Sequence, residues 1–306
     1  MIKLSTQSIG YASFVKSRKF VGFGAMAAML LASGCAANLP FTGGGAAQAS
    51  AVEGAPITFA DAADLVLISP YIVDVTITKS SRIEDEDAPG LRPDSARLLV
   101  TASVNTLLRG SGGIPGEVRF LVDWPKDSRG KVAKLKNRRF TVFTRPVAGQ
   151  PGVLQLMQAD SIVEFSPAND ALIRAATREA VAINAPAAIT GVSQAFHFPG
   201  TISGEGETQI FLDTQGGVPV SINVTSRSGA APLWNVSLGE VVDTQARAPA
   251  RDSMLWYRLA CGALPSRLPV ESLASKTQAA NVKADADYQY VRQALGACPR
   301  TRANVR

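Results

Sequence analysis

The sequence predicts a mainly β fold with some helix, of the α+β class. We expect a small antiparallel barrel-like domain, followed by a β-hairpin-rich domain that two C-terminal helices close. Three observations predict this fold. Runs rich in β-branched and aromatic residues recur in the first half of the chain, separated by turn residues. A Gly-Gly turn joins two such runs in the second half. Two stretches with helical periodicity follow.

We expect the first domain over residues 57–185. Its predicted strands are bounded by polar loops and cover residues 65–78, 97–108, 117–123, 139–144 and 153–165, the last interrupted near Asp160. Pro70 falls inside the first of these runs and predicts an edge strand or a bulge. Ser166 and Pro167 predict the start of a helix that reaches about residue 183, because Ser is a favoured N-cap and Pro is tolerated at the first helical position.

We expect the second domain over residues 190–306. Its predicted strands cover residues 207–213, 218–225 and 232–242, and Thr214–Gly217 is the hairpin signal between the first two. Asp252 is the predicted N-cap of a helix that ends at Gly262. A second helix is predicted over residues 284–297. The first of these helices is apolar almost all round near Trp256, which favours packing in the core over a binding surface.

The first 34 residues have the pattern of an export signal. Four basic residues and no acidic residue precede a 13-residue apolar stretch, Phe20–Ala32, which is shorter than the roughly 20 residues that a membrane-spanning helix needs. The stretch then runs into Leu31-Ala32-Ser33-Gly34-Cys35, which resembles the lipobox of bacterial lipoproteins. The resemblance implies a signal peptide over residues 1–34 and a lipid on Cys35. Ala36, in place of Asp, implies forwarding to the outer membrane.

The alternative is an ordinary signal peptide cleaved after Ala49, because Ala47-Gln48-Ala49 fits the small-x-small cleavage pattern. That cleavage would leave a soluble periplasmic or secreted protein. Residues 35–56 are rich in Gly, Ala and Ser and show no periodicity. They predict a flexible tether between the lipid and the first domain.

The charge of the mature chain argues against nucleic acid as a partner. The whole sequence has 31 basic and 25 acidic residues, but four of the basic ones lie in the expected signal. The remaining 27 basic residues give a net charge of only +2, which does not support a global field for nucleic acid.

The three cysteines are Cys35, Cys261 and Cys298. If Cys35 carries lipid, an even pair remains, and in an oxidising compartment Cys261 and Cys298 predict a disulfide that ties the last two helices together. Two separate buried thiols are the alternative.

Three short sequence segments in the first domain resemble netrin-like domains, which are built on an OB-type barrel. These segments are Ala63-Asp64-Leu65-Val66, a long predicted strand that ends in Leu107-Leu108-Arg109-Gly110, and Arg139-Phe140-Thr141-Val142-Phe143. The resemblance covers residues 63–143 and implies a small barrel. That fold hosts inhibitors, binding modules and structural domains.

Two polar motifs carry little chemistry. His197 is the one histidine, and its neighbours Phe196 and Phe198 would share the opposite strand face, which predicts a surface or rim histidine. The chain shows no G-x-S-x-G nucleophile motif. The acidic run 84–87 lacks the alternating ligand spacing of a calcium loop and predicts a solvated loop. We therefore expect no metal and no cofactor.

A basic stretch is the remaining candidate for binding. Between Lys126 and Arg139 lie seven basic residues: Lys126, Arg129, Lys131, Lys134, Lys136, Arg138 and Arg139. No aromatic residue interleaves them, so base stacking is not indicated. We expect an exposed loop, with a patch for an envelope protein or an anionic polymer as the functional alternative.

The sequence favours a non-catalytic lipoprotein of the cell envelope, attached to the membrane through Cys35, that acts as a binding or assembly module. Two alternatives stay open. One is an envelope hydrolase that uses two carboxylates and no histidine, because the chain has 25 acidic residues. The other is an inhibitor of an envelope enzyme, by analogy with the netrin-like resemblance.

Overall fold

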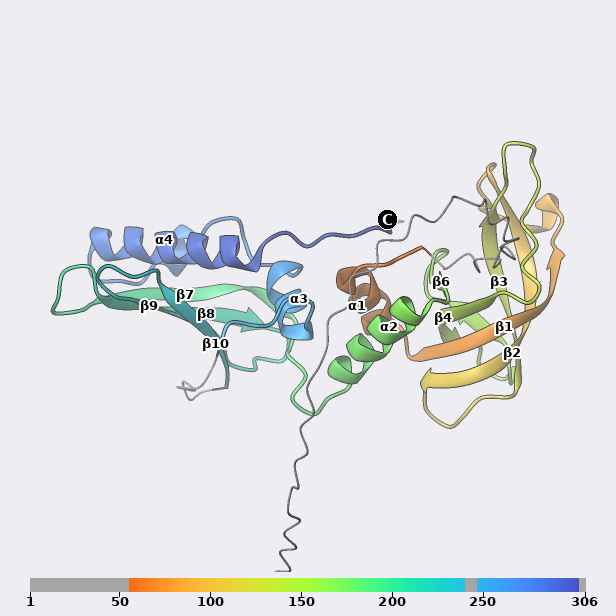
Figure 1. Cartoon of the computed structure of the whole chain (residues 1–306), viewed down its shortest axis with the longest axis horizontal. Coiled ribbons are helices and arrows are strands. Elements are labelled where there is room, and N and C mark those ends of the chain that lie inside the picture. Colours follow the sequence, from red (N-terminus) through yellow and green to blue (C-terminus); the bar gives the residue numbers. More distant parts are fainter. Residues whose placement is uncertain (1–54, 240–246, 303–306) are drawn as a thin grey trace, which may run out of the picture. The chain divides into compact units, whose positions relative to one another are not determined.

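The structure is a computed structural model that describes residues 55–239 and 247–302. The expected signal peptide, Cys35 and all but the last two residues of the expected tether lie outside the described residues. Residues 50–306 belong to one compact unit. Its described part contains two antiparallel sheets and four α-helices, which confirms the predicted mainly β, α+β class (Figure 1). The division into domains at residues 57–185 and 190–306 stays a prediction.

The first sheet contains six strands, and the predicted strands from residue 97 to 165 are confirmed. They are β1 (Tyr71–Arg82), β2 (Ser95–Arg109), β3 (Glu117–Pro125), β4 (Arg139–Pro146), β5 (Leu154–Leu156) and β6 (Ile162–Glu164). The strand order is β3-β2-β1-β4-β5, and β6 also pairs with β4. One parallel bridge, between Arg119 of β3 and Val153 just before β5, joins the two ends of this order. The sheet therefore curls on itself in the way that a barrel requires.

Alternate residues of these strands fill the inside of the curled sheet, because successive side chains of a strand point to opposite faces. Phe120 of β3 and Phe140 of β4 are almost fully buried there, together with Val75 and Ile77 of β1. The outward residues of β2 and β3 include Leu99 and Leu121, which stay exposed.

Helix α1 (Phe59–Ile68) corrects the prediction of a strand that begins at Leu65. Thr58 caps this helix by accepting a hydrogen bond from the Asp61 N–H, and the Asp61 carboxylate accepts one from the Thr58 N–H in return. Most of the helix is buried, including Asp61, so its sequence lacks the exposed polar face that gives a surface helix its periodicity. Pro70 lies between α1 and β1 rather than at a bulge.

Helix α2 (Pro167–Ala180) confirms the predicted helix after the first sheet. The Ser166 hydroxyl accepts a hydrogen bond of 3.1 Å from the Asn169 N–H, and Pro167 occupies the first helical position. The helix ends about three residues earlier than predicted. Ile173 and Ala176 bury one side of α2 in the cluster that also contains Leu65 and Val66 of α1.

The second sheet has four strands where the sequence predicted three. They are β7 (Ile189–Pro199), β8 (Gly206–Thr214), β9 (Val220–Ser226) and β10 (Leu233–Leu238), paired in chain order. Strand β7 was not predicted, although its aromatic residues lie in the segment that contains His197. The hairpin between β8 and β9 is confirmed, and Gly216 and Gly217 both adopt a positive φ there, which glycine tolerates without strain.

The two C-terminal helices are α3 (Met254–Ala260) and α4 (Gln278–Leu295). The predicted cap at Asp252 is wrong, because Ser253 caps α3 and accepts a hydrogen bond from the Trp256 N–H. Helix α4 begins at a Thr277 cap, several residues earlier than predicted. It lies along one face of the second sheet (Figure 1). Trp256 and Leu259 are buried, as the apolar sequence of this helix predicted.

Within the residues that the structure describes, no helix combines the length and the apolar character that crossing a membrane requires.

Candidate functional site

A groove runs between β3 and the segment around β5. It has a volume of about 690 Å³. Five consecutive residues of β3, from 119 to 123, line one wall, and seven consecutive residues, from 153 to 159, line the other. Consecutive residues can line one wall only where the strand presents its edge, because the side chains alternate between the two faces. The groove is therefore a gap between two strand edges.

The edge of β3 faces this gap with unpaired main-chain groups. The Arg119 N–H donates a hydrogen bond of 2.8 Å to the Gly152 oxygen, so the odd-numbered residues of β3 direct their N–H and C=O groups away from β2. Beyond the bridge at Arg119, the main chain of Leu121 and Asp123 pairs with no other described residue. The same alternation applies to β5. The Val147 N–H donates a hydrogen bond to the Val153 oxygen, so the odd-numbered residues of this segment direct their main-chain groups toward β4. The main-chain groups of Leu156 therefore face the gap. Both walls of the groove thus offer free donors and acceptors.

The floor beside the β3 edge is apolar. Leu99 of β2 and Leu121 of β3 are directly paired across the sheet and remain 39% and 49% exposed. Their neighbours on the same face are the paired Arg97 and Asp123, whose side chains form a two-pronged ion pair with distances of 2.7 and 2.8 Å. Exposed leucines flanked by a neutralised ion pair favour a partner that is largely apolar at this point.

Two further cavities extend the groove at its ends. One shares Asp123 and Ala159 with it and also contains Asp160 and Arg302, and the other shares Val147 and Gln150 with it. The Asp160 carboxylate forms an ion pair of 2.6 Å with Arg302, close to the C-terminal end of the described chain. The two carboxylates in this region, Asp123 and Asp160, are therefore both held by arginines.

The predicted basic stretch divides into two parts. Arg129, Lys131, Lys134 and Lys136 are exposed, as expected. Lys126 lies 3.7 Å from Asp85.

The expectation of a fully exposed stretch is wrong for Lys126, Arg138 and Arg139, which are partly buried. Arg138 binds Glu164 and stacks over Trp124 and Phe140. Arg139 binds the fully buried Asp74. These two arginines hold the start of β4 in place.

His197 corrects the expectation of a surface histidine. Its side chain is only 9% exposed and faces α4 from β7. Nδ1 lies 2.9 Å from the Thr208 hydroxyl, which in turn donates a hydrogen bond of 2.5 Å to Asp287 of α4. Because the hydroxyl proton is used on Asp287, the Thr208 oxygen accepts from His197, so Nδ1 carries the proton. Lys283 completes this chain by binding both Asp287 and Ser226.

The environment of His197 favours its neutral form. Burial lowers the pKa of His197 below its ordinary value of 6.5; Asp287 opposes the shift, and Lys283 adds to it. The chain His197–Thr208–Asp287–Lys283 joins residues up to 90 positions apart and ends at the hydroxyl of Ser226, a residue that is only 8% exposed. We assign it to packing of α4 on the sheet.

Within the acidic run at residues 84–87, Asp85–Asp87 forms a short 3-10 turn. The Asp85 carboxylate forms an ion pair of 2.8 Å with Arg82. Among residues 55–239 and 247–302, no group of three or more His, Cys, Asp or Glu side chains is placed to hold a metal ion.

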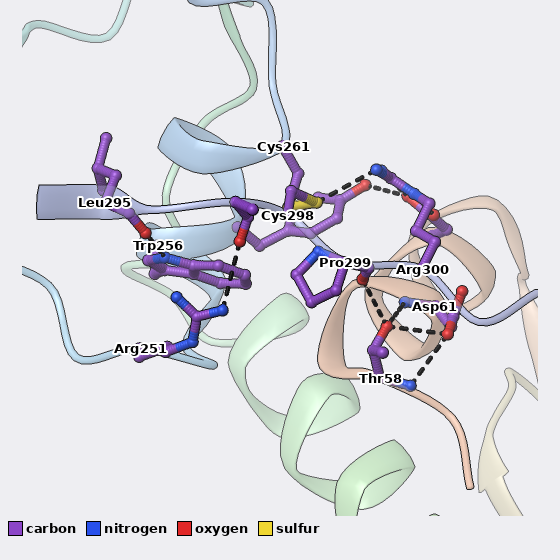
Figure 2. The surroundings of a disulfide bond; sticks show 12 residues. Thr58, Asp61, Arg251, Trp256, Cys261, Leu295, Cys298, Pro299 and Arg300 are labelled. Carbon is purple, nitrogen blue, oxygen red and sulfur yellow. Dashed lines mark hydrogen bonds and ion pairs between the residues drawn. A yellow bond between two sulfur atoms is a disulfide. The ribbon is translucent and has the colours of Figure 1, made fainter. Parts of the chain in front are cut away.

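Cys261 and Cys298 form the predicted disulfide, with Cα atoms 5.3 Å apart (Figure 2). From Cys298 the chain continues to α1, where the Thr58 hydroxyl donates to the Pro299 oxygen at 2.9 Å. Arg300 binds Asp64 of α1 at 2.6 Å. The disulfide thus starts a short C-terminal segment that ends at the Arg302–Asp160 ion pair beside the groove.

Sequence reasoning missed the groove. The available signal was the side-chain pattern of β2 and β3, where Leu99 and Leu121 are apolar on the face opposite to the buried residues. Cys35 lies outside the described residues, so its expected lipid stays a prediction. No protein-family model and no curated protein matches this chain.

Proposed function

We propose that this protein is a non-catalytic binding module of the bacterial cell envelope, which takes up an extended polypeptide segment as an added strand along the open edge of β3. The observation that carries the proposal is the unpaired main chain of Leu121 and Asp123, which faces a groove of about 690 Å³. An open strand edge is a template for another chain, and strand addition is a recurrent mode of peptide recognition.

The groove fits an extended peptide better than a compact ligand. A strand placed along the edge of β3 would bond to the main-chain groups of Leu121 and Asp123. Its alternate side chains would point toward the interior near Phe120 and toward the exposed leucines outside. Main-chain bonds supply affinity in this mode, and the pockets for alternate side chains supply selectivity.

The envelope location rests on the N-terminal sequence. The basic start, the apolar stretch and the lipobox-like segment at Cys35 support export and lipid attachment. An anchor of this kind would place the module at the outer membrane, facing the periplasm. The netrin-like resemblance belongs to the same proposal, and the curled six-stranded sheet supports it.

A carboxylate-pair hydrolase is the second candidate, because Asp123 and Asp160 line the same cavity. Arg97 and Arg302 bind these two carboxylates. A carboxylate whose oxygen is occupied by an arginine is not free to exchange a proton with a substrate. The ion pairs therefore favour binding over hydrolysis. An inhibitor of an envelope enzyme is a special case of the same binding mode.

The experiment compares two substitutions at one position. Leu121→Pro removes the N–H that faces the groove, and Leu121→Ala removes the side chain but keeps that N–H. Proline is tolerated at an edge strand whose N–H has no partner, so both variants should fold. Binding is measured by calorimetry with peptides selected on the wild-type protein from a random library.

We expect Leu121→Ala to bind within a few-fold of wild type, and Leu121→Pro to bind at least about tenfold more weakly, because a peptide carbonyl loses its donor. Equal binding by wild type and Leu121→Pro would contradict strand addition. Failure of the library to yield any peptide that binds the groove would contradict the proposal as a whole.

A further inference from the structure

The face of the second sheet opposite to α4 presents an ordered set of aromatic and amide side chains. Direct pairing places Phe196, Gln209, Asn223 and Asn235 in one row across all four strands. The row on one side contains Gln194, Phe211, Ser221 and Ser237, and the row on the other contains Phe198, Glu207, Thr225 and Leu233. Residues directly opposite each other in paired strands share one face, so these twelve side chains lie on one face of the sheet, which we call the amide face. Ser221, Asn223 and Ser237 are buried within it, and the others are partly or fully exposed.

The amide face is distinct from the packed face of the same sheet. Thr208 and Ser226, which alternate with its members, bind Asp287 and Lys283 of α4. Helix α4 therefore packs on the face of the sheet opposite to the amide face.

Three phenylalanines form one edge of the amide face. The rings of Phe196 and Phe198 are stacked with centroids 6.1 Å apart, and the ring of Phe211 meets Phe196 edge-on at 6.2 Å. Phe198 is 55% exposed and Phe211 is 39% exposed. A ligand that covered these exposed rings would gain hydrophobic free energy, because apolar area would leave water.

The amides beside these rings are partly satisfied. Asn223 Nδ2 donates to the oxygens of Asn235 and Ser237 at 3.1 and 3.2 Å. The Asn223 Oδ1 atom is buried and has no partner among the described residues, and the residue is only 3% exposed. A buried acceptor without a donor is costly, so this position favours a hydroxyl or amide donor from outside the chain.

The charge of the amide face narrows the ligand class. Of its twelve side chains only Glu207 is ionisable, and Glu207 accepts a hydrogen bond from Gln209. A face without lysine or arginine does not suit phosphate, carboxylate-rich polymers or nucleic acid. A ligand for it must combine flat apolar patches with many neutral hydroxyl or amide groups.

We propose that the amide face binds a neutral glycan chain. Sugar rings present C–H surfaces that stack on aromatic rings, and their equatorial hydroxyls match the paired donors and acceptors of Asn and Gln. Phe198 and Phe211 provide the stacking surfaces, and Gln209 and Asn235, beside the buried Asn223, provide the hydrogen bonds. The site is separate from the groove between β3 and β5, so it does not depend on the function proposed for that groove.

The test uses the exported chain without its signal peptide and three neutral oligosaccharides: chitohexaose, cellohexaose and maltohexaose. Binding is followed by NMR shifts of backbone amides, with sugar up to about 10 mM, where even weak sites are detected. We expect at least one sugar to shift the signals of β7 and β8 and to leave those of β3 unchanged. Polygalacturonate, a charged polymer, serves as the negative control.

Two variants separate a glycan site from an apolar docking surface. Phe198→Leu keeps apolar area but removes the ring, and Gln209→Ala removes the amide. Each should weaken glycan binding at least about tenfold, whereas Leu121→Ala in the groove should leave it unchanged. Thermal melting of each variant establishes that it is folded.

No shift with any of the three sugars would overturn the proposal. Binding that Phe198→Leu leaves intact would also overturn it, because an apolar protein surface would behave in that way. Shifts confined to β3 and β5 would place the sugar in the groove and contradict the assignment to the amide face.

Discussion

Trp256 donates a hydrogen bond of 2.9 Å from its indole Nε1 to the main-chain oxygen of Leu295, the last residue of α4. The Cys261–Cys298 disulfide joins the ends of the same two helices a few residues further along (Figure 2). Two independent links therefore hold the C-terminal end of α4 against α3. The segment from Pro299 to Arg302 starts at this point, so its position on α1 and beside the groove depends on both links.

Replacing both cysteines, as Cys261→Ser with Cys298→Ser, should lower the free energy of unfolding by about 3–4 kcal/mol. The two residues are 37 positions apart, and in the chain-entropy model a loop of that size gives this value. Urea unfolding under oxidising conditions measures it. Cys35→Ser is the matched control and should leave stability unchanged. Two free thiols in the oxidised wild-type protein would contradict the disulfide.

The single histidine makes its own protonation easy to follow. We predict that His197 titrates with a pKa below 6.5 and that its neutral form carries the proton on Nδ1, because Thr208 accepts from that atom. The unfolded chain then binds a proton more readily than the folded protein, so stability falls as the pH drops below 6.5. Nitrogen-15 NMR of the imidazole reports both properties. An Nε2-protonated tautomer, or a pKa above 6.5, would refute the assignment.

Two groups of basic residues near β4 should respond differently to neutralisation. Arg139→Gln removes the charged partner of the buried Asp74 carboxylate, which keeps the hydrogen bond from Asn105. The change should cost about 3 kcal/mol, the lower end for a broken buried pair, because Arg139 is partly exposed. Replacing Lys131, Lys134 and Lys136 by Gln should change stability by less than about 0.5 kcal/mol. Thermal and urea unfolding compare the two proteins. A larger loss in the triple lysine variant would show that the loop is structural.

The envelope proposal predicts a specific N-terminus. The mature protein from bacterial membranes should begin at Cys35 and carry an acyl mass there, and Cys35→Ser should leave the membrane fraction or remain uncleaved. Mass spectrometry of the intact protein and of its N-terminal peptide measures this. A mature chain that begins at Ser50 without an acyl group would establish ordinary signal cleavage instead.

Local signals predicted much of the fold. The Ser166–Pro167 start of α2 and the Gly216–Gly217 turn depend on a few adjacent residues, and the structure confirms both. The disulfide followed from counting cysteines. Helix α1 was missed because the β-branched Val66 and Ile68 favour strands and because burial on most sides removed the helical period. The Thr58–Asp61 capping box was the signal that could have revealed it.

The sites depend on long-range placement, which single-sequence patterns do not contain. His197 is buried because α4, some 90 residues later, packs on β7 and supplies Asp287. The groove exists because β3 and β5 meet at one bridge and then separate, and nothing local to Leu121 predicts that separation. The amide face needed the register of four strands, which placed Gln209, Asn223 and Asn235 side by side.

Amide hydrogen exchange at β3 tests strand addition most directly. In the free protein, the Leu121 and Asp123 amides should exchange much faster than those of Phe120 and Val122, which face β2. When a selected peptide fills the groove, the Leu121 and Asp123 amides should become protected to a similar degree as their neighbours. Saturating peptide that leaves both amides in fast exchange would contradict the proposal that this edge receives a strand.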